Sequence, residues 1–263
     1  MLGAALTALA IGAAAVPAAA QDVAVTNARL AVGDGSAPID GATVVIRQGR
    51  VQAAGRGVAV PSGVRTVDAA GRWVTPGMVA GFSRVGLIEV DAVDESNDST
   101  AATSIYSAAL DIAPALNPMG TPVAYNRVAG VTRALVYPGR GGGLFNGRGA
   151  LVDLGSDATM VTRGGLFQYV EFGETGAERA GGSRAALVLH FRNLLNEARD
   201  YGRNPAAYDG RTREAILNRA DAAALLRVLD GRDRLFIRVE RALRARRMTS
   251  ASVVPARMAS RRL

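Results

Sequence analysis

Short runs in which apolar and polar residues alternate fill the first part of the chain, from residue 23 to residue 74. Turn residues separate these runs, and a period of two is typical of half-buried β-strands. Gln48-Gly49 lies between the runs 43–46 and 50–53 and predicts a β-hairpin. Residues 69–71, between the runs 64–68 and 72–74, predict a second hairpin. The pattern indicates about four to six short strands, as in a small β-sandwich or half of one.

After residue 77 the pattern changes to that of an α/β protein. Residues 78–82 predict a strand buried on both faces, and residues 85–90 continue it or form a second short element. Residues 91–104 are acidic and polar and predict a loop. Further strands are expected at residues 131–137, 150–154, 159–162 and 235–239, the last of the parallel-sheet type.

Apolar residues at helical spacing predict helices between these strands. Residues 105–116 and 123–129 are expected to be helical, with residues 99–104 as the start of the first helix. A helix at residues 183–201 has an apolar stripe made of Leu187, Phe191, Leu194, Leu195 and Ala198. A later helix, capped by Thr212 and followed by Gly231, has on one side Ile216, Ala220, Ala223 and Val228. The alternation of strands and helices predicts a parallel α/β barrel or a layered sheet.

The N-terminal segment is an apolar run of small residues. Ala18 and Ala20 stand at the −3 and −1 positions before Gln21, so residues 1–20 are expected to be a secretory signal peptide cleaved near Ala20-Gln21. We therefore expect a periplasmic or secreted protein. The alternative is an uncleaved anchor, because about 19 apolar residues can just span a bilayer. Membrane contact is expected in that case only.

Composition excludes several kinds of chemistry. The 263 residues include no Lys and no Cys, and they include one His, His190. A Schiff-base Lys, a Cys nucleophile and a metal site with two His ligands are therefore excluded. No Gly-x-Ser-x-Gly motif is present, so a nucleophile-elbow hydrolase is not indicated. A half-buried structural role is favoured for His190, over a role as ligand or base, because it lies beside the apolar stripe of its helix.

The net charge of +8 is concentrated at the C-terminal end. Residues 241–263 contain seven Arg and no acid, whereas the rest of the chain is nearly neutral. We therefore expect no specific nucleic-acid partner for the body of the protein. Residues 242–263 lack a regular pattern and are interpreted as a disordered or out-of-frame tail. The alternative is a tail that binds nucleic acid or anionic lipid.

Several motifs in the first third of the chain occur together in one known family. Residues 25–30 (Val-Thr-Asn-Ala-Arg-Leu), 33–35 (Gly-Asp-Gly), 41–55 and 67–77, which end in Thr75-Pro76-Gly77, resemble the amidohydrolase superfamily. They are similar in particular to its secreted imidazolonepropionase-like members. The similarity extends to residues 130–132, 138–139 and 147–149, and it covers about residues 22–241.

The resemblance implies a fold and an extent. Residues 21–76 would be the N-terminal part of a β-sandwich, and residues 77–241 the first half of a TIM-like (β/α) barrel, entered through Thr75-Pro76-Gly77. A complete family member has eight βα units and a C-terminal return to the sandwich. By the resemblance, the chain is therefore expected to be truncated and its barrel incomplete.

One departure from the family pattern bears on chemistry. Members of this family carry Asp-x-His-x-His after the Thr-Pro-Gly motif, and the two His bind a catalytic divalent metal such as Zn²⁺. Phe82 and Arg84 occupy the two His positions here. Phe has no lone pair for a metal, and Arg is a permanent cation that repels one. We therefore expect no metal cofactor, no metal ligand and no catalytic residue in this chain.

Two loops are candidate ligand sites. The acidic loop contains Asp91, Asp94, Glu95 and Asp98, which could bind Ca²⁺ or a cationic ligand. No EF-hand spacing is present, so a solvated loop is the favoured interpretation. The backbone N–H groups of Gly141, Gly142 and Gly143 could cradle an anion. The Lys-Ser/Thr ending of a P-loop is missing there, so a structural turn is favoured.

Two functions follow as hypotheses. The first is an exported amidohydrolase-like protein, related to metal-dependent hydrolases of C–N bonds other than peptide bonds, that is itself inactive. The alternative is a noncatalytic periplasmic binding or scaffolding module. Such a module would bind a small molecule through residues 91–104 and 138–149. Because half a barrel leaves an unpaired sheet edge, it would also self-associate.

Overall fold

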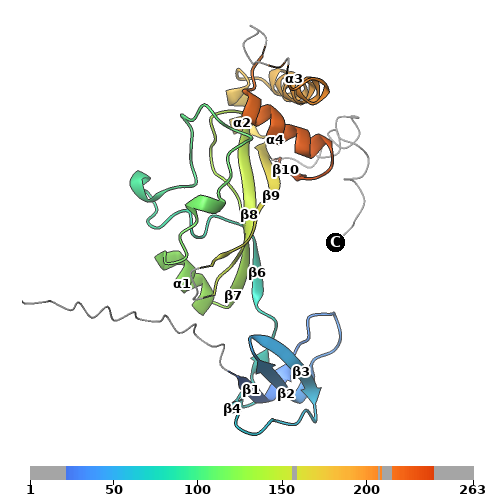
Figure 1. Ribbon diagram of the computed structural model, residues 1–263. Coiled ribbons are helices and arrows are strands. Elements are labelled where there is room, and N and C mark those ends of the chain that lie inside the picture. Colours follow the sequence, from blue (N-terminus) through green and yellow to red (C-terminus); the bar gives the residue numbers. More distant parts are fainter. Residues whose placement is uncertain (1–21, 156–158, 207, 209–214, 240–263) are drawn as a thin grey trace, which may run out of the picture. The chain divides into compact units, whose positions relative to one another are not determined.

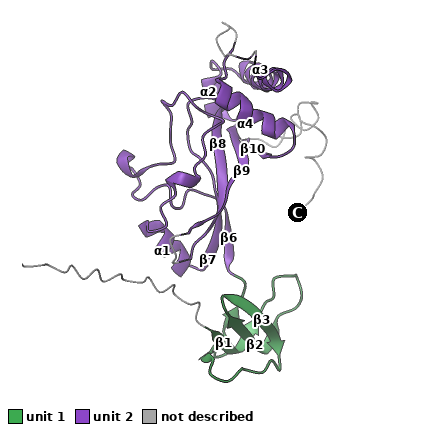
Figure 2. Ribbon diagram, viewed as in Figure 1, with its two compact units in different colours: residues 1–76 green, residues 77–263 purple. Residues whose placement is uncertain are grey.

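The computed structural model describes residues 22–155, 159–206, 208 and 215–239 (Figure 1). The expected signal peptide at residues 1–20 and the Arg-rich tail at residues 242–263 lie outside the described residues. The chain divides into two compact units, residues 1–76 and 77–263 (Figure 2). Among the described residues, no helix is long and apolar enough to cross a membrane.

The first unit is a five-stranded sheet in the order β3-β2-β1-β4, with β5 also paired to β1. Its strands are β1 (Val23–Leu30), β2 (Ile39–Arg47), β3 (Arg50–Arg56), β4 (Arg65–Asp68) and β5 (Trp73–Val74). The hairpin predicted at Gln48-Gly49 is confirmed, because β2 and β3 are antiparallel with Arg47 opposite Arg50. Gln48 and Gly49 have φ values of 51° and 72°, as a type I′ turn requires.

The second predicted hairpin is wrong. β4 and β5 both pair with β1 in the parallel sense, so the chain does not reverse between them. The backbone N–H of Ala69 donates to Thr26 O and that of Gly71 to Asn27 O, both at 2.8 Å. These bonds keep the intervening segment alongside β1. The described part of this unit therefore forms one sheet, and no second sandwich layer is present in it.

The second unit contains another five-stranded sheet, in the order β10-β9-β8-β7-β6 (Figure 1). Its strands are β6 (Met78–Ser83), β7 (Val131–Val136), β8 (Phe145–Asp153), β9 (Val161–Glu171) and β10 (Arg234–Arg238). Its helices are the 3₁₀ turns η1 (Asp94–Ser96) and η2 (Ala113–Ala115), and α1 (Thr121–Val128), α2 (Glu174–Arg179), α3 (Arg184–Arg203) and α4 (Arg219–Leu229). The strands predicted at residues 131–137 and 235–239 and the helix at 123–129 are confirmed.

The sheet is mixed, and the expectation of a purely parallel arrangement is wrong. β6 pairs with β7 and β9 with β10 in parallel, but β8 is antiparallel to both of its neighbours. A parallel crossover takes about a dozen residues or more. The connections at residues 137–144 and 154–160 are shorter than that, so the chain turns back at each. β8 and β9 are also longer than predicted, and residues 147–149, to which the family resemblance extends, lie inside β8.

Helix α3 follows its sequence pattern closely. Ser183 caps it by accepting a hydrogen bond from the N–H of Ala186 at 3.0 Å. The predicted stripe is buried in the larger hydrophobic core, where it meets Phe145, Val170 and residues of α4. α3 thereby covers the end of the sheet where β8 begins and β9 ends.

Helix α4 differs from its prediction in start and face. Asn218 is its N-cap, and the predicted cap Thr212 lies outside the described residues. Ile216 and Ala220 are exposed, whereas the buried face contains Asp221, Ala222, Ala224, Leu225 and Val228. The predicted end is right, because Gly231 follows the helix with a φ of 72°.

The helix predicted at residues 105–116 is absent, and only η2 forms there. Tertiary partners take up the backbone groups that a helix would satisfy internally. The N–H groups of Ser107 and Ala109 donate to the Asp221 carboxylate at 3.0 and 2.7 Å. The N–H of Arg148 donates to Leu110 O at 2.7 Å, which joins this segment to β8. Long-range hydrogen bonds therefore override local helical propensity.

A second core lies beneath β6, β7 and β8. It contains Val85 and Leu87, which belong to a turn, so residues 85–90 do not continue the strand β6, which was one of the two alternatives expected for them. That turn has a single bridge, between Ile88 and Asn97. The segment after β6 thus covers one face of the sheet with apolar loop residues. The opposite face of the sheet remains for the site described next.

Candidate functional site

A pocket lies toward the carboxyl ends of the four strands that run in the same direction, β6, β7, β9 and β10. Its volume is about 350 Å³. The lining residues are Phe82, Tyr137, Tyr169, Phe236, Ile237, Arg238 and Val239. The carboxyl end of parallel strands is where open and closed α/β folds build their binding sites. The position and the lining make this pocket the candidate functional site.

Aromatic rings form the floor and walls of the pocket. Ring centroids lie 5.3 Å apart for Phe82 and Phe236, 5.8 Å for Phe82 and Tyr137, and 5.0 Å for Tyr137 and Tyr169. Phe167 lies 4.5 Å from Phe236. These distances are those of favourable edge-to-face and tilted ring pairs, which hold one another in place.

A small residue on β8 makes room for this cluster. A Cβ atom at Gly149 would lie 2.2 Å from Cζ of Phe167, so any larger residue there would displace the ring. The Phe167 side chain therefore lies over the antiparallel strand. β8 contributes space, and the other strands of the sheet, or the residues that follow them, contribute the rings.

The expectation that residues 78–82 are buried on both faces is wrong. β6 is at the edge of the sheet, and its side chains are exposed by 55% at Met78, 60% at Val79 and 49% at Phe82. The pairing with β7 shifts register between Ala80 and Ser83, and Phe82 has a φ of 56°. Such a bulge re-aims a side chain. Ala80 packs on the core while Phe82, two residues later, lines the pocket.

The residues at the family's metal positions do not fit a metal ion. The Phe82 ring packs against Tyr137 and Phe236 and offers no lone pair. The guanidinium carbon of Arg84 lies 5.2 Å from the ring centroid of Tyr137, so a permanent cation stands beside the pocket. Across the described residues, no group of three His, Cys, Asp or Glu side chains is placed to hold a metal ion.

Arg238 is the charged residue in the pocket lining, while Arg84 lies over the ring of Tyr137 and Glu171 is paired with Arg238. Arg238 donates from Nη1 to Oε1 of Glu171 at 3.2 Å. Nε of Arg84 is buried and has no hydrogen-bond acceptor among the described residues. Burial raises the pKa of Tyr169 to about 12, and the nearby Glu171 charge adds to the rise. The Tyr169 phenol is therefore protonated at neutral pH and contributes no negative charge.

The acidic loop lies apart from the pocket lining. Asp91, Asp94, Glu95 and Asp98 are all exposed, and none of them lines the pocket. Ser96 organises the loop, since its hydroxyl donates to Val90 O at 2.9 Å. The structure therefore does not bring these carboxylates together with the aromatic residues. Cation binding by this loop stays a prediction.

The glycine loop is packed closely against residues 104–107. A Cβ atom would lie 1.9 Å from Ser104 O at Gly142, and 3.0 Å from Oγ of Ser107 at Gly143. The N–H of Gly141 donates to Oδ1 of Asn146 at 3.3 Å. Close packing accounts for these glycines, and anion binding by the loop stays a prediction.

His190 is half-buried on α3, and burial lowers its pKa below the ordinary value. It is not one of the residues that line the pocket. Its half-buried position on α3 agrees with the position predicted from the sequence.

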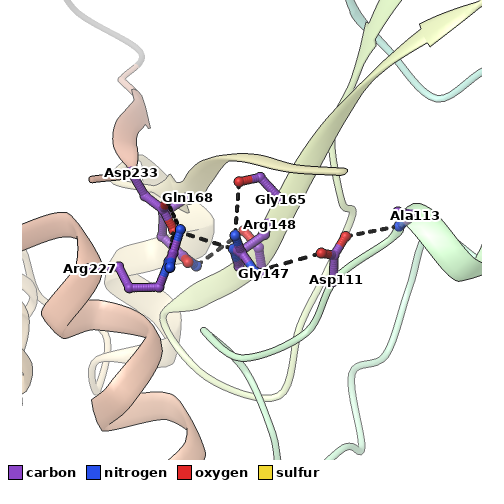
Figure 3. Close-up of polar contacts among 8 residues, drawn as sticks. All are labelled: Asp111, Ala113, Gly147, Arg148, Gly165, Gln168, Arg227 and Asp233. Carbon is purple, nitrogen blue, oxygen red and sulfur yellow. Dashed lines mark hydrogen bonds and ion pairs between the residues drawn. The ribbon is translucent and has the colours of Figure 1, made fainter. Parts of the chain in front are cut away.

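A buried ion cluster positions β10 (Figure 3). Asp233, 4% exposed, accepts from Nε and Nη2 of Arg227, both at 2.8 Å, and its Oδ2 lies 3.4 Å from Nε of Arg148. Nη1 of Arg148 is 3.6 Å from Oδ2 of Asp111, and Nη2 donates to Gly165 O at 2.9 Å. The cluster joins the start of β10 to β8 and β9. Sequence reasoning missed it because its members are far apart in the chain and form no local motif.

Comparison with known proteins supports the fold. No protein-family model matches the chain, and no curated protein matches it. An amidohydrolase from Thermotoga maritima MSB8 matches with a TM-score of 0.69 and 19% identity, over 86% of this chain and 61% of that chain. A molinate hydrolase structure matches with a TM-score of 0.24 and 32% identity, over 27% of this chain and 15% of that chain, which is too low a TM-score to compare folds.

The chain thus has the fold of part of an amidohydrolase and spans 61% of the length of that neighbour. This agrees, at the level of fold, with the resemblance found in the motifs.

Proposed function

We propose that this chain belongs to the amidohydrolase superfamily, and that its pocket binds a ligand without a metal and without hydrolysis. The observation that carries the proposal is the place of Phe82. Its ring packs between Tyr137 and Phe236 in the pocket wall, at the position where the resemblance expects the first His of a metal pair.

Metal-dependent hydrolysis makes demands that these residues do not meet. A hydrolytic metal lowers the pKa of its bound water, and several deprotonated ligands must hold it in place. Phe82 and Arg84 supply no such ligand, and Arg84 adds a positive charge. β6 is therefore a packing strand at the pocket.

Metal content and activity test the proposal together. The full chain is incubated with Zn²⁺ or Mn²⁺, freed of excess metal and analysed by mass spectrometry of the elements. Hydrolysis of amides and cyclic amides is then measured with and without a chelator. We expect no stoichiometric metal and no chelator-sensitive hydrolysis. Metal at one equivalent together with chelator-sensitive turnover would contradict the proposal.

A designed variant provides the positive control. The double variant Phe82→His, Arg84→His places an imidazole at each of the two positions where the resemblance expects a metal-binding His, and it removes the Arg84 cation. We expect this double variant to retain more Zn²⁺ than the wild-type chain. Arg192→Gln, on the exposed side of α3, removes one positive charge elsewhere and should leave metal content unchanged.

A second candidate function is a scaffolding module that self-associates. The observation that favours it is the edge strand β6, where Met78, Val79 and Phe82 are exposed. An exposed apolar edge pairs readily with another chain, and a Lys on it blocks such pairing. Light scattering should show concentration-dependent association that Val79→Lys abolishes. A wild-type chain that is monomeric at every concentration would exclude this candidate.

Export to the periplasm or out of the cell is part of the proposal, and it rests on residues 1–20. The N-terminus of the protein recovered after expression tests it. A mature chain that starts at Gln21 is the expected result, and an intact N-terminus in the membrane fraction would indicate an anchor.

A further inference from the structure

The two residues that replace the family's metal pair place an aromatic ring and a cation at the same pocket. Phe82 lines the pocket directly. Arg84 lies over Tyr137, whose ring is itself part of the lining. Arg238 lines the pocket from β10, next to Phe236. Three different strands or strand ends thus bring rings and guanidinium groups together.

The charges around the pocket do not cancel. Glu171 is paired with Arg238 at 3.2 Å, and that bond uses one of the five N–H donors of a guanidinium. No ion pair to Arg84 is present within the described part of the chain, and its Nε is buried without an acceptor. Arg238 in the lining and Arg84 over the ring of Tyr137 are thus two cations, against one nearby anion, Glu171. A ligand with one negative charge would neutralise the excess.

We propose that the pocket binds a small planar carboxylate, an aromatic or similarly flat acid, with its ring among Phe82, Tyr137 and Phe236 and its carboxylate toward Arg238 and Arg84. The inference deepens the proposed function, since it takes the pocket to bind without a metal. A volume of about 350 Å³ is within the range of small-molecule sites.

The aromatic residues at the pocket account for the flat ring of the ligand, and the arginines account for its carboxylate. Offset and edge-to-face contacts with rings favour a flat apolar body. Guanidinium groups favour a carboxylate, which they bind through charge-assisted hydrogen bonds. A cationic ligand would suit the rings alone, but Arg84 and Arg238 repel it. A bare inorganic anion would suit the arginines and leave the rings unfilled.

The test compares four probes that separate ring from charge. Benzoate has both, benzyl alcohol has the ring, benzylamine has the ring with a positive charge, and acetate has the carboxylate. Binding to the full chain is measured by calorimetry or ligand-detected NMR in the presence of EDTA. We expect benzoate to bind about tenfold more tightly than benzyl alcohol or acetate, as one charge-assisted interaction implies. Benzylamine should bind most weakly.

Single substitutions test separately which side chains bind the ring of the ligand and which bind its carboxylate. Arg238→Gln should weaken benzoate about tenfold and leave benzyl alcohol unchanged. Arg238→Lys keeps the charge and should lose less. Phe82→Leu should weaken benzoate and benzyl alcohol alike, because it removes a ring and no charge. Tyr125→Leu removes a ring that is 74% exposed on α1, so it should change neither.

The outcomes separate this inference from the function on which it rests. No benzoate binding, equal binding of benzoate and benzylamine, or binding that EDTA abolishes would each overturn the inference. An Arg238→Gln chain that keeps its thermal melt and its benzoate affinity would do the same. Stoichiometric metal with chelator-sensitive hydrolysis would overturn the proposed function, and that is measured without these probes.

Discussion

Asp233 is the residue whose replacement should most clearly loosen the candidate site. It stands immediately before β10, the strand that carries Phe236 and Arg238 into the pocket. Asp233→Asn keeps the size of the side chain and removes its charge. Arg227 would lose a bidentate partner, and Arg148 would lose the nearer of its two carboxylates.

The expected loss of stability follows from burial. Asp233 is 4% exposed, and Arg148 has a side-chain exposure of 21%. Removing one partner of a buried ion pair costs about 3–5 kcal/mol, because the other charges remain without compensation. The Arg227 side chain is 39% exposed, so water screens part of that cost. We therefore expect the lower end of the range, about 3 kcal/mol.

Urea unfolding followed by two probes measures this loss. Trp73 is the only tryptophan in the sequence and belongs to the first unit, so fluorescence reports on that unit. The α-helices among the described residues all belong to the second unit, so far-ultraviolet ellipticity reports there. Asp233→Asn should lower the midpoint of the ellipticity transition and leave the fluorescence transition unchanged.

A variant that breaks an exposed ion pair on the same loop is the matched control for the effect of burial. Asp230→Asn breaks an ion pair on the same loop whose side chains are 55% and 44% exposed. That change should cost less than about 1 kcal/mol. If Asp233→Asn were as stable as Asp230→Asn, the buried cluster would not hold β10, and the reasoning would be refuted.

Three further changes test other parts of the fold. Asp221→Ala leaves the backbone N–H groups of Ser107 and Ala109 without an acceptor and should lower the free energy of unfolding by about 3 kcal/mol. Urea unfolding followed by ellipticity measures this, and an unchanged midpoint would contradict it. Gly142→Ala places a Cβ atom 1.9 Å from Ser104 O and should cost at least about 1 kcal/mol in the same assay. The pKa of Tyr169 is raised to about 12, so the unfolded chain loses the phenolic proton first and stability falls as pH rises from about 10 to 12. Tyr169→Phe should reduce that fall by about 2 kcal/mol, measured by urea unfolding at several pH values in this range. Parallel stability curves for the variant and the wild-type chain would contradict this.

Local patterns predicted the elements whose stability is local. The Gln48-Gly49 hairpin needs two residues with positive φ, and the apolar stripe of α3 repeats at helical spacing from Leu187 to Ala198, about three turns. Both are present as expected. The segment 105–116 was predicted to be helical too, but Asp221 and β8 supply its backbone groups with partners from elsewhere in the chain.

The buried face of a helix and the direction of a strand were predicted less well than the presence of the helices and strands themselves. The buried face of α4 was assigned wrongly because Asp221 is buried by its bonds to Ser107 and Ala109, which no apolar pattern marks. The direction of β8 was missed because strand periodicity is the same in parallel and antiparallel sheets. The pocket was not predicted: Phe82 was singled out only because it stands where the resemblance expects a metal-binding His, and the predicted ligand loops do not line the pocket.

The sequence by itself determined which side-chain donors stand at positions 82 and 84 and which local elements the chain forms. Phe82 and Arg84 offer no metal donors in any fold, and turn residues and apolar spacing act between near neighbours. Only the tertiary structure decided that Phe82, Tyr137 and Phe236 meet in one pocket, and that a buried ion cluster holds the strand beside it. Those contacts join residues that lie far apart in the chain, and their geometry is set by strand order, a bulge in β6 and the antiparallel course of β8.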